Sequence, residues 1–189
     1  MTDFSYLNVD NAYKLINQKV IKTPLVTNDY INNLLEAEIY FKLENLQNTG
    51  SFKLRGATHK ITKLIENVKD SGVVAYSSGN HAQAVAYSSM INSISAKIIM
   101  PKTAPQIKIE NTKNYGAEVI LYDTYFQNRE EIGMEIQKKD NRTLIKPYDD
   151  EDIIAGQGTA AIEIVNDLKE QSIEPVSYTH LTLPTIYSV

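Results

Sequence analysis

The sequence predicts an α/β fold, in which parallel strands form a sheet and helices cover both of its faces. Three observations support this prediction. Short apolar runs alternate with longer segments of helical periodicity, the connections between them are short, and several runs end at a proline, a glycine or a polar turn. With 189 residues, of which 42% are hydrophobic, the chain can bury the core of one domain or of one and a fraction.

Helices are expected where apolar side chains recur every three or four residues between a capping residue and a glycine or proline. The first of them has apolar side chains at positions 9, 12, 15 and 16, with Asn8 or Asp10 as its cap. In chain order the expected helices are Val9–Lys19, Asp29–Leu35, Ser51–Asn67, Asn80–Ile91, Gln106–Tyr115, Tyr125–Lys138 and Gln157–Lys169.

Strands are expected where β-branched and aromatic residues form short apolar runs. They are Glu38–Leu43, Val73–Tyr76, Ala96–Met100, Glu118–Leu121 and Thr143–Ile145. Thr23-Pro24-Leu25 begins an extended segment, and Asp149–Ala155 is expected to be an acidic loop. Ligands of parallel sheets bind at the carboxyl ends of strands. The loops expected there are Asn48–Ser51, Ser77–Asn80 and Asp149–Gly158.

Composition and charge exclude several classes of function. The net charge is −4 and charges of both signs are mixed along the chain, so nucleic acid is not an expected partner. The absence of cysteine excludes disulfides and thiolate metal sites and fits a reducing compartment. The first residues lack the apolar core of a secretory signal, and no apolar run is long enough to cross a membrane. We expect a soluble cytoplasmic protein.

Lys53 is the residue whose local setting most suggests chemistry. It lies in the first turn of an expected helix, just after Ser51, a good N-cap residue. The partial positive charge of a helix N-terminus and the nearby Arg55 both disfavour an ammonium, so both lower the pKa of the lysine. A neutral amine can attack a carbonyl and form a Schiff base. The alternative is an ordinary solvated surface lysine.

The segment Ser77–Ala82 follows an expected strand and opens an expected helix. Gly79 allows the backbone to turn sharply and approach a ligand. The unpaired N–H groups of the helix start suit a carboxylate or a phosphate, and Asn80 can both donate and accept hydrogen bonds. The alternative is an ordinary capped helix, in which His81 serves packing.

Two further patterns have weaker functional meaning. The run from Gly156 to Ala161 matches the G-x-G-x-x-A dinucleotide fingerprint, but an acidic loop precedes it where a buried strand is required. These glycines more simply permit a tight loop-to-helix turn. The acidic run Asp149–Asp152 lacks the alternating ligands and central glycine of a calcium loop, so no metal site is predicted.

The last residues, Val176–Val189, differ in character from the rest of the chain. They read VSYTHLTLPTIYSV and contain no charged residue apart from His180 when it is protonated. This run resembles a translated sequencing adapter, and authentic sequence is then expected to stop near Pro175. The alternative is a genuine β-rich tail.

Taken together, the motifs resemble the threonine dehydratase and serine racemase group of fold type II pyridoxal-phosphate enzymes, whose fold is like that of the tryptophan synthase β subunit. The resemblance covers roughly Val9 to Pro175. The motifs that carry it are Thr23-Pro24-Leu25, KLENLQNTGSFKLRGA from Lys42, SSGNHAQAVA from Ser77, Pro147-Tyr148-Asp149-Asp150 and AGQGT from Ala155.

The resemblance implies a role for each site residue. Lys53 would hold the cofactor, pyridoxal 5′-phosphate, as a Schiff base and move the α-proton of the substrate. Phe52 would pack beside the cofactor ring and Asn80 would bind its 3′-hydroxyl. Ser78 would handle a proton on the opposite face, and Arg129 loosely matches an arginine that racemases bring to the substrate. The residues implied to bind substrate are Ser77, Ser78, Gly79, Asn80 and His81.

The implied activity is an ammonia-lyase that converts L-threonine or L-serine into a 2-oxo acid and ammonia, as in isoleucine biosynthesis. A serine racemase and a non-catalytic amino-acid-binding module are the alternatives. The resemblance also implies a large cofactor domain at 1–49 and 147–175 and a small α/β domain at 50–146, with 176–189 as a non-native tail.

The family's phosphate-binding glycine loop, its ring-nitrogen partner and some members' metal ligands follow the AGQGT helix, and residues 176–189 match none of them. We therefore expect an incomplete second domain and an inactive fragment that binds the cofactor weakly. Related enzymes are often homo-oligomers, and their partners are small amino acids.

Overall fold

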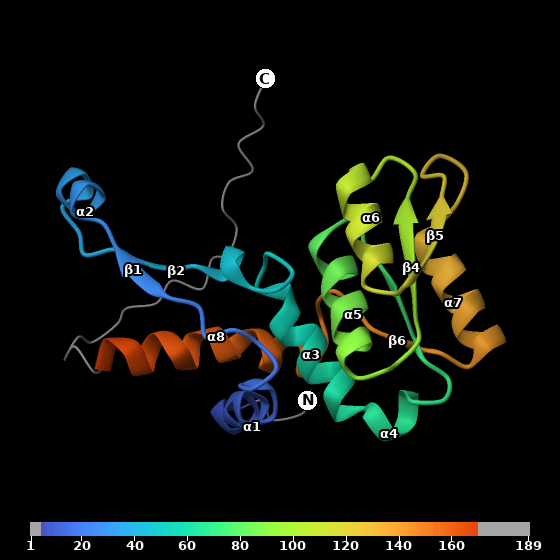
Figure 1. Ribbon diagram of the computed structural model, residues 1–189, viewed down its shortest axis with the longest axis horizontal. Coiled ribbons are helices and arrows are strands. Elements are labelled where there is room, and N and C mark those ends of the chain that lie inside the picture. The colour runs from blue at the N-terminus through green and yellow to red at the C-terminus, as the bar shows by residue number, and fades with distance from the viewer. Residues whose placement is uncertain (1–4, 170–189) are drawn as a thin grey trace.

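A computed structural model describes residues 5–169 of the chain (Figure 1). The predicted adapter-like tail, Val176–Val189, lies outside these residues. Within them, no helix combines the length and the apolar character that crossing a membrane requires. The predicted division at residues 49/50 and 146/147 stays a prediction.

The main sheet has four parallel strands in the order β5-β4-β3-β6, which confirms the predicted fold class. The strands are β3 (Val73–Tyr76), β4 (Ala96–Pro101), β5 (Glu118–Tyr122) and β6 (Thr143–Leu144). Successive side chains of a strand point to opposite faces. Val73 and Ala75 therefore belong to one buried cluster, and Val74 between them belongs to another.

Helices cover both faces of this sheet, as Figure 1 shows. On one face, side chains of α5 (Asn80–Ile91) and α6 (Gln106–Asn114) complete the larger core. On the other face, Ile132 and Ile136 of α7 (Arg129–Asp140) pack against the smaller cluster. The sheet is thus buried on both sides, which explains why its strands read as almost continuous apolar runs.

The first strands of the chain do not join the parallel sheet. After α1 (Tyr6–Ile16), β1 (Leu25–Thr27) and β2 (Tyr40–Lys42) pair antiparallel on either side of α2 (Asp29–Leu35), with Leu25 opposite Lys42. The connection at residues 28–39, which holds α2, reverses the direction of the chain, so the two strands run in opposite directions. Figure 1 shows this hairpin projecting away from the main sheet, alongside α8 (Glu151–Lys169).

Several predicted boundaries are wrong. The helices predicted over Val9–Lys19 and Tyr125–Lys138 are α1 and α7, and the N-cap of α1 is Ser5 instead of Asn8 or Asp10. The helix predicted over Ser51–Asn67 is divided into α3 (Lys53–Lys63) and α4 (Ile65–Val68), after a short 3₁₀ helix at Glu44–Leu46. The predicted acidic loop Asp149–Ala155 is mostly the start of α8. Asp150 Oδ1 accepts the backbone N–H groups of Asp152 and Ile153 and so acts as a cap. Acidic side chains in the first turn then suit the positive end of the helix.

The glycines of the AGQGT motif lie inside α8 and allow two helices to pack closely. A Cβ at Gly156 would lie 2.7 Å from the Cα of Gly56 in α3, and one at Gly158 would lie 2.9 Å from Val9 of α1. The predicted loop-to-helix turn is therefore wrong. The resemblance to a dinucleotide fingerprint is also explained, because small residues are needed here for helix packing.

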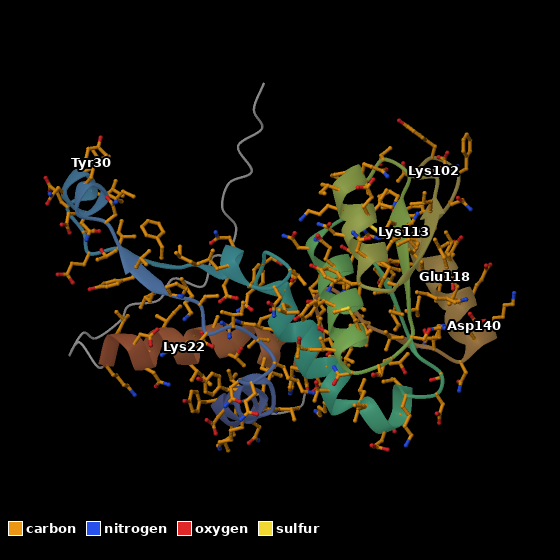
Figure 2. The ribbon with its side chains drawn as sticks, viewed as in Figure 1. Lys22, Tyr30, Lys102, Lys113, Glu118 and Asp140 are labelled. Atoms are coloured by element: carbon orange, nitrogen blue, oxygen red, sulfur yellow. The ribbon has the colours of Figure 1, made fainter. Side chains whose placement is uncertain are left out.

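Arg55, which is fully buried on α3, joins three segments through ion pairs. Its guanidinium donates to Glu44 before the helix at 2.7 Å and to Glu163 of α8 at 2.8 Å. Lys42 of β2 also reaches Glu163, at 2.8 Å. Figure 2 shows Lys22 beside α8, where it pairs with Asp167. The hairpin, α3 and α8 are therefore held by one charged network, which we call the Arg55 network.

Replacing Gly156 with alanine should lower the free energy of unfolding by about 1–3 kcal/mol, because the added methyl group forces α3 and α8 apart. Gly133→Ala in α7 is the matched control. Its Cβ would meet Tyr76 at 3.4 Å, an ordinary contact, so better helix propensity should stabilise the protein by up to about 1 kcal/mol. Urea unfolding measures both changes, and equal effects would contradict the packing argument.

Arg55→Leu should lower the free energy of unfolding by about 3–5 kcal/mol, because Glu44 loses its cation and the buried Glu163 keeps, among the described residues, only that of Lys42. Lys69→Gln breaks the exposed pair with Glu66 and should cause no measurable change. Chemical denaturation of the two variants compares them. A stable Arg55→Leu protein would show that the Arg55 network does not hold these segments together.

Candidate active site

Lys53 opens α3 and points toward the segment that follows β6. Its Nζ donates a hydrogen bond to the carbonyl oxygen of Pro147 at 2.8 Å and lies 5.4 Å from the centroid of the Phe52 ring. Phe52, not Ser51, is the N-cap residue, and it makes no side-chain cap. Within the described residues, the buried Ser51 Oγ has no hydrogen-bond partner. The predicted capping role of Ser51 is therefore wrong.

The pKa of Lys53 is lowered by burial of its ammonium, so the predicted direction is confirmed. The predicted contribution of Arg55 is not the cause. The Arg55 guanidinium lies between two carboxylates, which raise its own pKa despite burial. Desolvation, rather than repulsion by a like charge, therefore favours the neutral amine of Lys53.

The Ser77–Asn80 loop connects the carboxyl end of β3 to α5, as predicted. Ser77 Oγ accepts the backbone N–H of Gly79 at 3.2 Å, while Ser78 and Asn80 are exposed. A Cβ at Gly79 would meet no heavy atom within 4 Å. Gly79 therefore leaves open space beside the first turn of α5, where a ligand can approach the backbone.

His81 lies inside the protein, with 3% of its surface exposed. Its Nε2 lies 3.1 Å from the carbonyl oxygen of Ile145, so this nitrogen carries the proton and donates it. Burial, with a smaller contribution from the nearby charge of Lys53, lowers the pKa of His81 to about 4, although the hydrogen bond to Ile145 acts in the opposite direction. The imidazole is thus a neutral packing group. Substrate contact through the backbone N–H of His81 stays a prediction.

The segment Ile145–Pro147, which leaves β6, brings the two candidate helix starts together. Pro147 accepts from Lys53 at the start of α3, and Ile145 accepts from His81 at the start of α5. These contacts join residues that are far apart in the chain. Lys53 and the Ser77–Asn80 loop therefore lie on either side of the segment Ile145–Pro147. This segment is at the carboxyl end of the sheet, where α/β proteins bind ligands.

Arg129 lies at the start of α7, with its guanidinium 5.2 Å from the centroid of the Tyr76 ring. Tyr76 is the last residue of β3 and directly precedes the Ser77–Asn80 loop. This cation–π contact places Arg129 at the same edge of the sheet. Its predicted contact with the substrate stays a prediction.

Lys108 is a site residue that the sequence analysis missed. It lies in the first turn of α6, and its Nζ donates to Asn80 Oδ1 at 2.9 Å. The loop before α6 follows β4, the neighbour of β3, but was not among the candidate loops. A signal was present, because a lysine in the first turn of a helix faces the positive end of the helix dipole, as Lys53 does.

Among the described residues, no group of three or more histidine, cysteine, aspartate or glutamate side chains is arranged to hold a metal ion. The acidic side chains at the start of α8 are instead used in ion pairs. Lys60 reaches Asp150 at 3.0 Å and Asp152 at 2.7 Å.

Comparison with known proteins gives consistent matches. Residues 16–184 match the family described as pyridoxal-phosphate dependent enzyme. The chain is 44% identical over 164 residues to L-threo-3-hydroxyaspartate ammonia-lyase of Saccharomyces cerevisiae, covering 87% of this chain and 50% of that protein. It is also 44% identical over 164 residues to serine racemase of Schizosaccharomyces pombe, covering 87% and 51%.

Among solved structures, the processed form of threonine deaminase isoform 2 from Solanum lycopersicum matches with a TM-score of 0.77 and 36% identity, covering 86% of this chain and 47% of that one. The chain thus spans about half the length of the curated relatives described here.

The buried, neutral His81 makes stability depend on pH. Its pKa is depressed to about 4 in the folded state, compared with about 6.5 in the unfolded chain. As pH falls from about 6.5 to 4, the unfolded chain therefore binds a proton that the folded chain does not bind. Its contribution, on the order of 3 kcal/mol, is fully present above pH of about 6.5 and lost toward pH of about 4.

His81→Gln should flatten the fall in stability over this range, measured by urea unfolding at several pH values. His59→Gln is the control, since the pKa of His59 is also lowered by burial but in another part of the fold. It should leave the contribution of His81 in place. An unchanged slope in His81→Gln would show that His81 takes up its proton normally.

Proposed function

Because the chain belongs to the family of pyridoxal-phosphate dependent enzymes, we propose that the protein is a dehydratase that converts L-threonine or L-serine into a 2-oxo acid and ammonia. The observation that carries the proposal is the half-buried Lys53, whose pKa is lowered by burial. It lies next to the segment Ile145–Pro147, as the Ser77–Asn80 loop does. The threonine deaminase and ammonia-lyase among the similar proteins support the reaction class.

The residues at this site suit pyridoxal phosphate. A lysine with a lowered pKa can bind the aldehyde, and the Phe52 ring beside its Nζ can pack against a flat aromatic ring. Asn80 has its Oδ1 occupied by Lys108, which leaves its Nδ2 free to donate to a ring oxygen. Gly79 leaves open space next to these groups. When bound, the cofactor supplies an electron-withdrawing ring that makes the α-proton of an amino acid removable.

The protein's own groups then divide the remaining tasks. The amine of Lys53, favoured in its neutral form by burial, takes the α-proton of the substrate. The N–H groups at the start of α5, with the exposed Ser78, bind the substrate carboxylate. The β-hydroxyl leaves as water. The released unsaturated amine takes up water and loses ammonia, so the reaction needs no oxidant.

A serine racemase is the second candidate. The observation that favours it is the exposed position of Ser78, which leaves its hydroxyl accessible for proton transfer on the ring face opposite Lys53. Serine racemase of Schizosaccharomyces pombe matches the chain as closely as the ammonia-lyase does. Incubation of the full-length protein with L-serine, followed by chiral separation, distinguishes the two: D-serine indicates racemisation, and pyruvate with ammonia indicates dehydration.

Lys53→Ala should abolish the visible absorbance that forms when pyridoxal phosphate is added to the purified chain, because the aldehyde loses its amine. In the full-length protein, production of 2-oxo acid from threonine, measured by its reaction with a hydrazine reagent, should be lost as well. Lys113→Ala, at an exposed position on α6 that is labelled in Figure 2, is the control and should behave as wild type. An equal visible band in Lys53→Ala would contradict the assignment.

A further inference from the structure

The side chain of Lys108 in α6 makes a hydrogen bond to Asn80 at the start of α5. A lysine three residues after the cap of α6 faces the positive end of that helix, which disfavours its ammonium. The side chain crosses to α5, where its Nζ meets Asn80 Oδ1 at 2.9 Å. The bond thus joins the helix starts that follow β4 and β3, the two central strands of the sheet.

This bond fixes the orientation of the Asn80 amide. A lysine ammonium has donors only, so the amide atom that faces it must be the oxygen. The NH₂ group of Asn80 therefore points away from Lys108, and within residues 5–169 no hydrogen bond from it is seen. An amide held in this way turns its NH₂ group, and not its oxygen, toward the side away from Lys108.

We infer that Lys108 is a positioning residue that turns the Asn80 amide so that its NH₂ group donates to the deprotonated ring oxygen of the cofactor. This inference rests on the proposed function. The ring hydroxyl of pyridoxal phosphate exists either as a hydroxyl, which donates, or as an anionic oxygen, which only accepts. An Asn80 whose NH₂ group faces the ring oxygen binds the anionic form more strongly.

The charge of Lys108 acts in the same direction. An ammonium bonded to the amide oxygen polarises the amide and strengthens its N–H donors. In the free chain this bond is exposed and contributes little to stability. A cofactor ring bound beside Gly79 would exclude water from it, so its effect appears in the bound state. Lys108 thereby controls the electronic state of the ring without touching the substrate.

The test compares the absorbance of the bound cofactor in wild type, Lys108→Met and Lys108→Arg. The form with an anionic ring oxygen absorbs in the visible, and the form with a ring hydroxyl absorbs in the near ultraviolet. Lys108→Met should lower the ratio of the visible to the near-ultraviolet band by roughly fivefold, the factor expected when one hydrogen bond is lost. Lys108→Arg keeps a charged donor and should restore the ratio.

Lys113→Met is the matched control, because it removes the same charge from an exposed position on the same helix, labelled in Figure 2. Its band ratio should equal that of wild type. Circular dichroism confirms that each variant is folded. Equal ratios in wild type, Lys108→Met and Lys113→Met would overturn the role of Lys108 while leaving the proposed function intact. Absence of both bands in wild type at saturating cofactor would overturn the proposed function, and with it this inference.

A second measurement examines the contact without the cofactor. In a ¹⁵N-labelled chain, the side-chain amide signal of Asn80 is identified by its loss in Asn80→Ala. This signal should shift in Lys108→Met and stay in place in Lys113→Met, because only Lys108 is bonded to the amide. An Asn80 signal that does not respond to Lys108→Met would overturn the inference whatever the cofactor does.

Discussion

The position of Lys53, the proposed cofactor-binding lysine, depends on the buried ion pairs of Arg55, two residues further along the same helix. Glu44 precedes α3 and Glu163 lies on α8, and both bind the Arg55 guanidinium. Burial alone would raise the pKa of Glu44, but hydrogen bonds from Arg55 and Thr23 outweigh it and keep the carboxyl ionised. Because α3 is held from both sides, the backbone at Lys53 has little freedom to move.

The close approach of α3 and α8 supports the same position. Gly56 and Gly156 allow the two backbones to touch, and this contact lies directly beside the Arg55 network. The segment Ile145–Pro147 then passes between the starts of α3 and α5 and accepts a hydrogen bond from each. Packing and charge thus combine to bring two distant helix starts to one edge of the parallel sheet.

Lys53 and Lys108 show how one feature can serve two purposes. Each lies in the first turn of a helix, where the dipole disfavours a cation. At Lys53, burial adds to this effect and favours a neutral amine that can react. At Lys108, the ammonium is instead bonded to the Asn80 amide. The two lysines differ in their surroundings, because burial lowers the pKa of Lys53 whereas Lys108 makes an exposed hydrogen bond to Asn80.

The sequence alone determined the elements whose signals are local. Periodicity and turn residues predicted Val73–Tyr76, Asp29–Leu35 and Asn80–Ile91 with the bounds that the structure has, and the motifs singled out Lys53 and the Ser77–Asn80 loop. The prediction of a loop over the acidic run at the start of α8 was wrong. Aspartate is common both as a helix cap, the role of Asp150, and in solvated loops, so the sequence does not distinguish the two.

Only the tertiary structure decided how distant segments meet: the contact of Gly56 with Gly156, the burial of His81, and the bond from Lys108 to Asn80. Such contacts join residues that are far apart in the chain, and no local pattern records them.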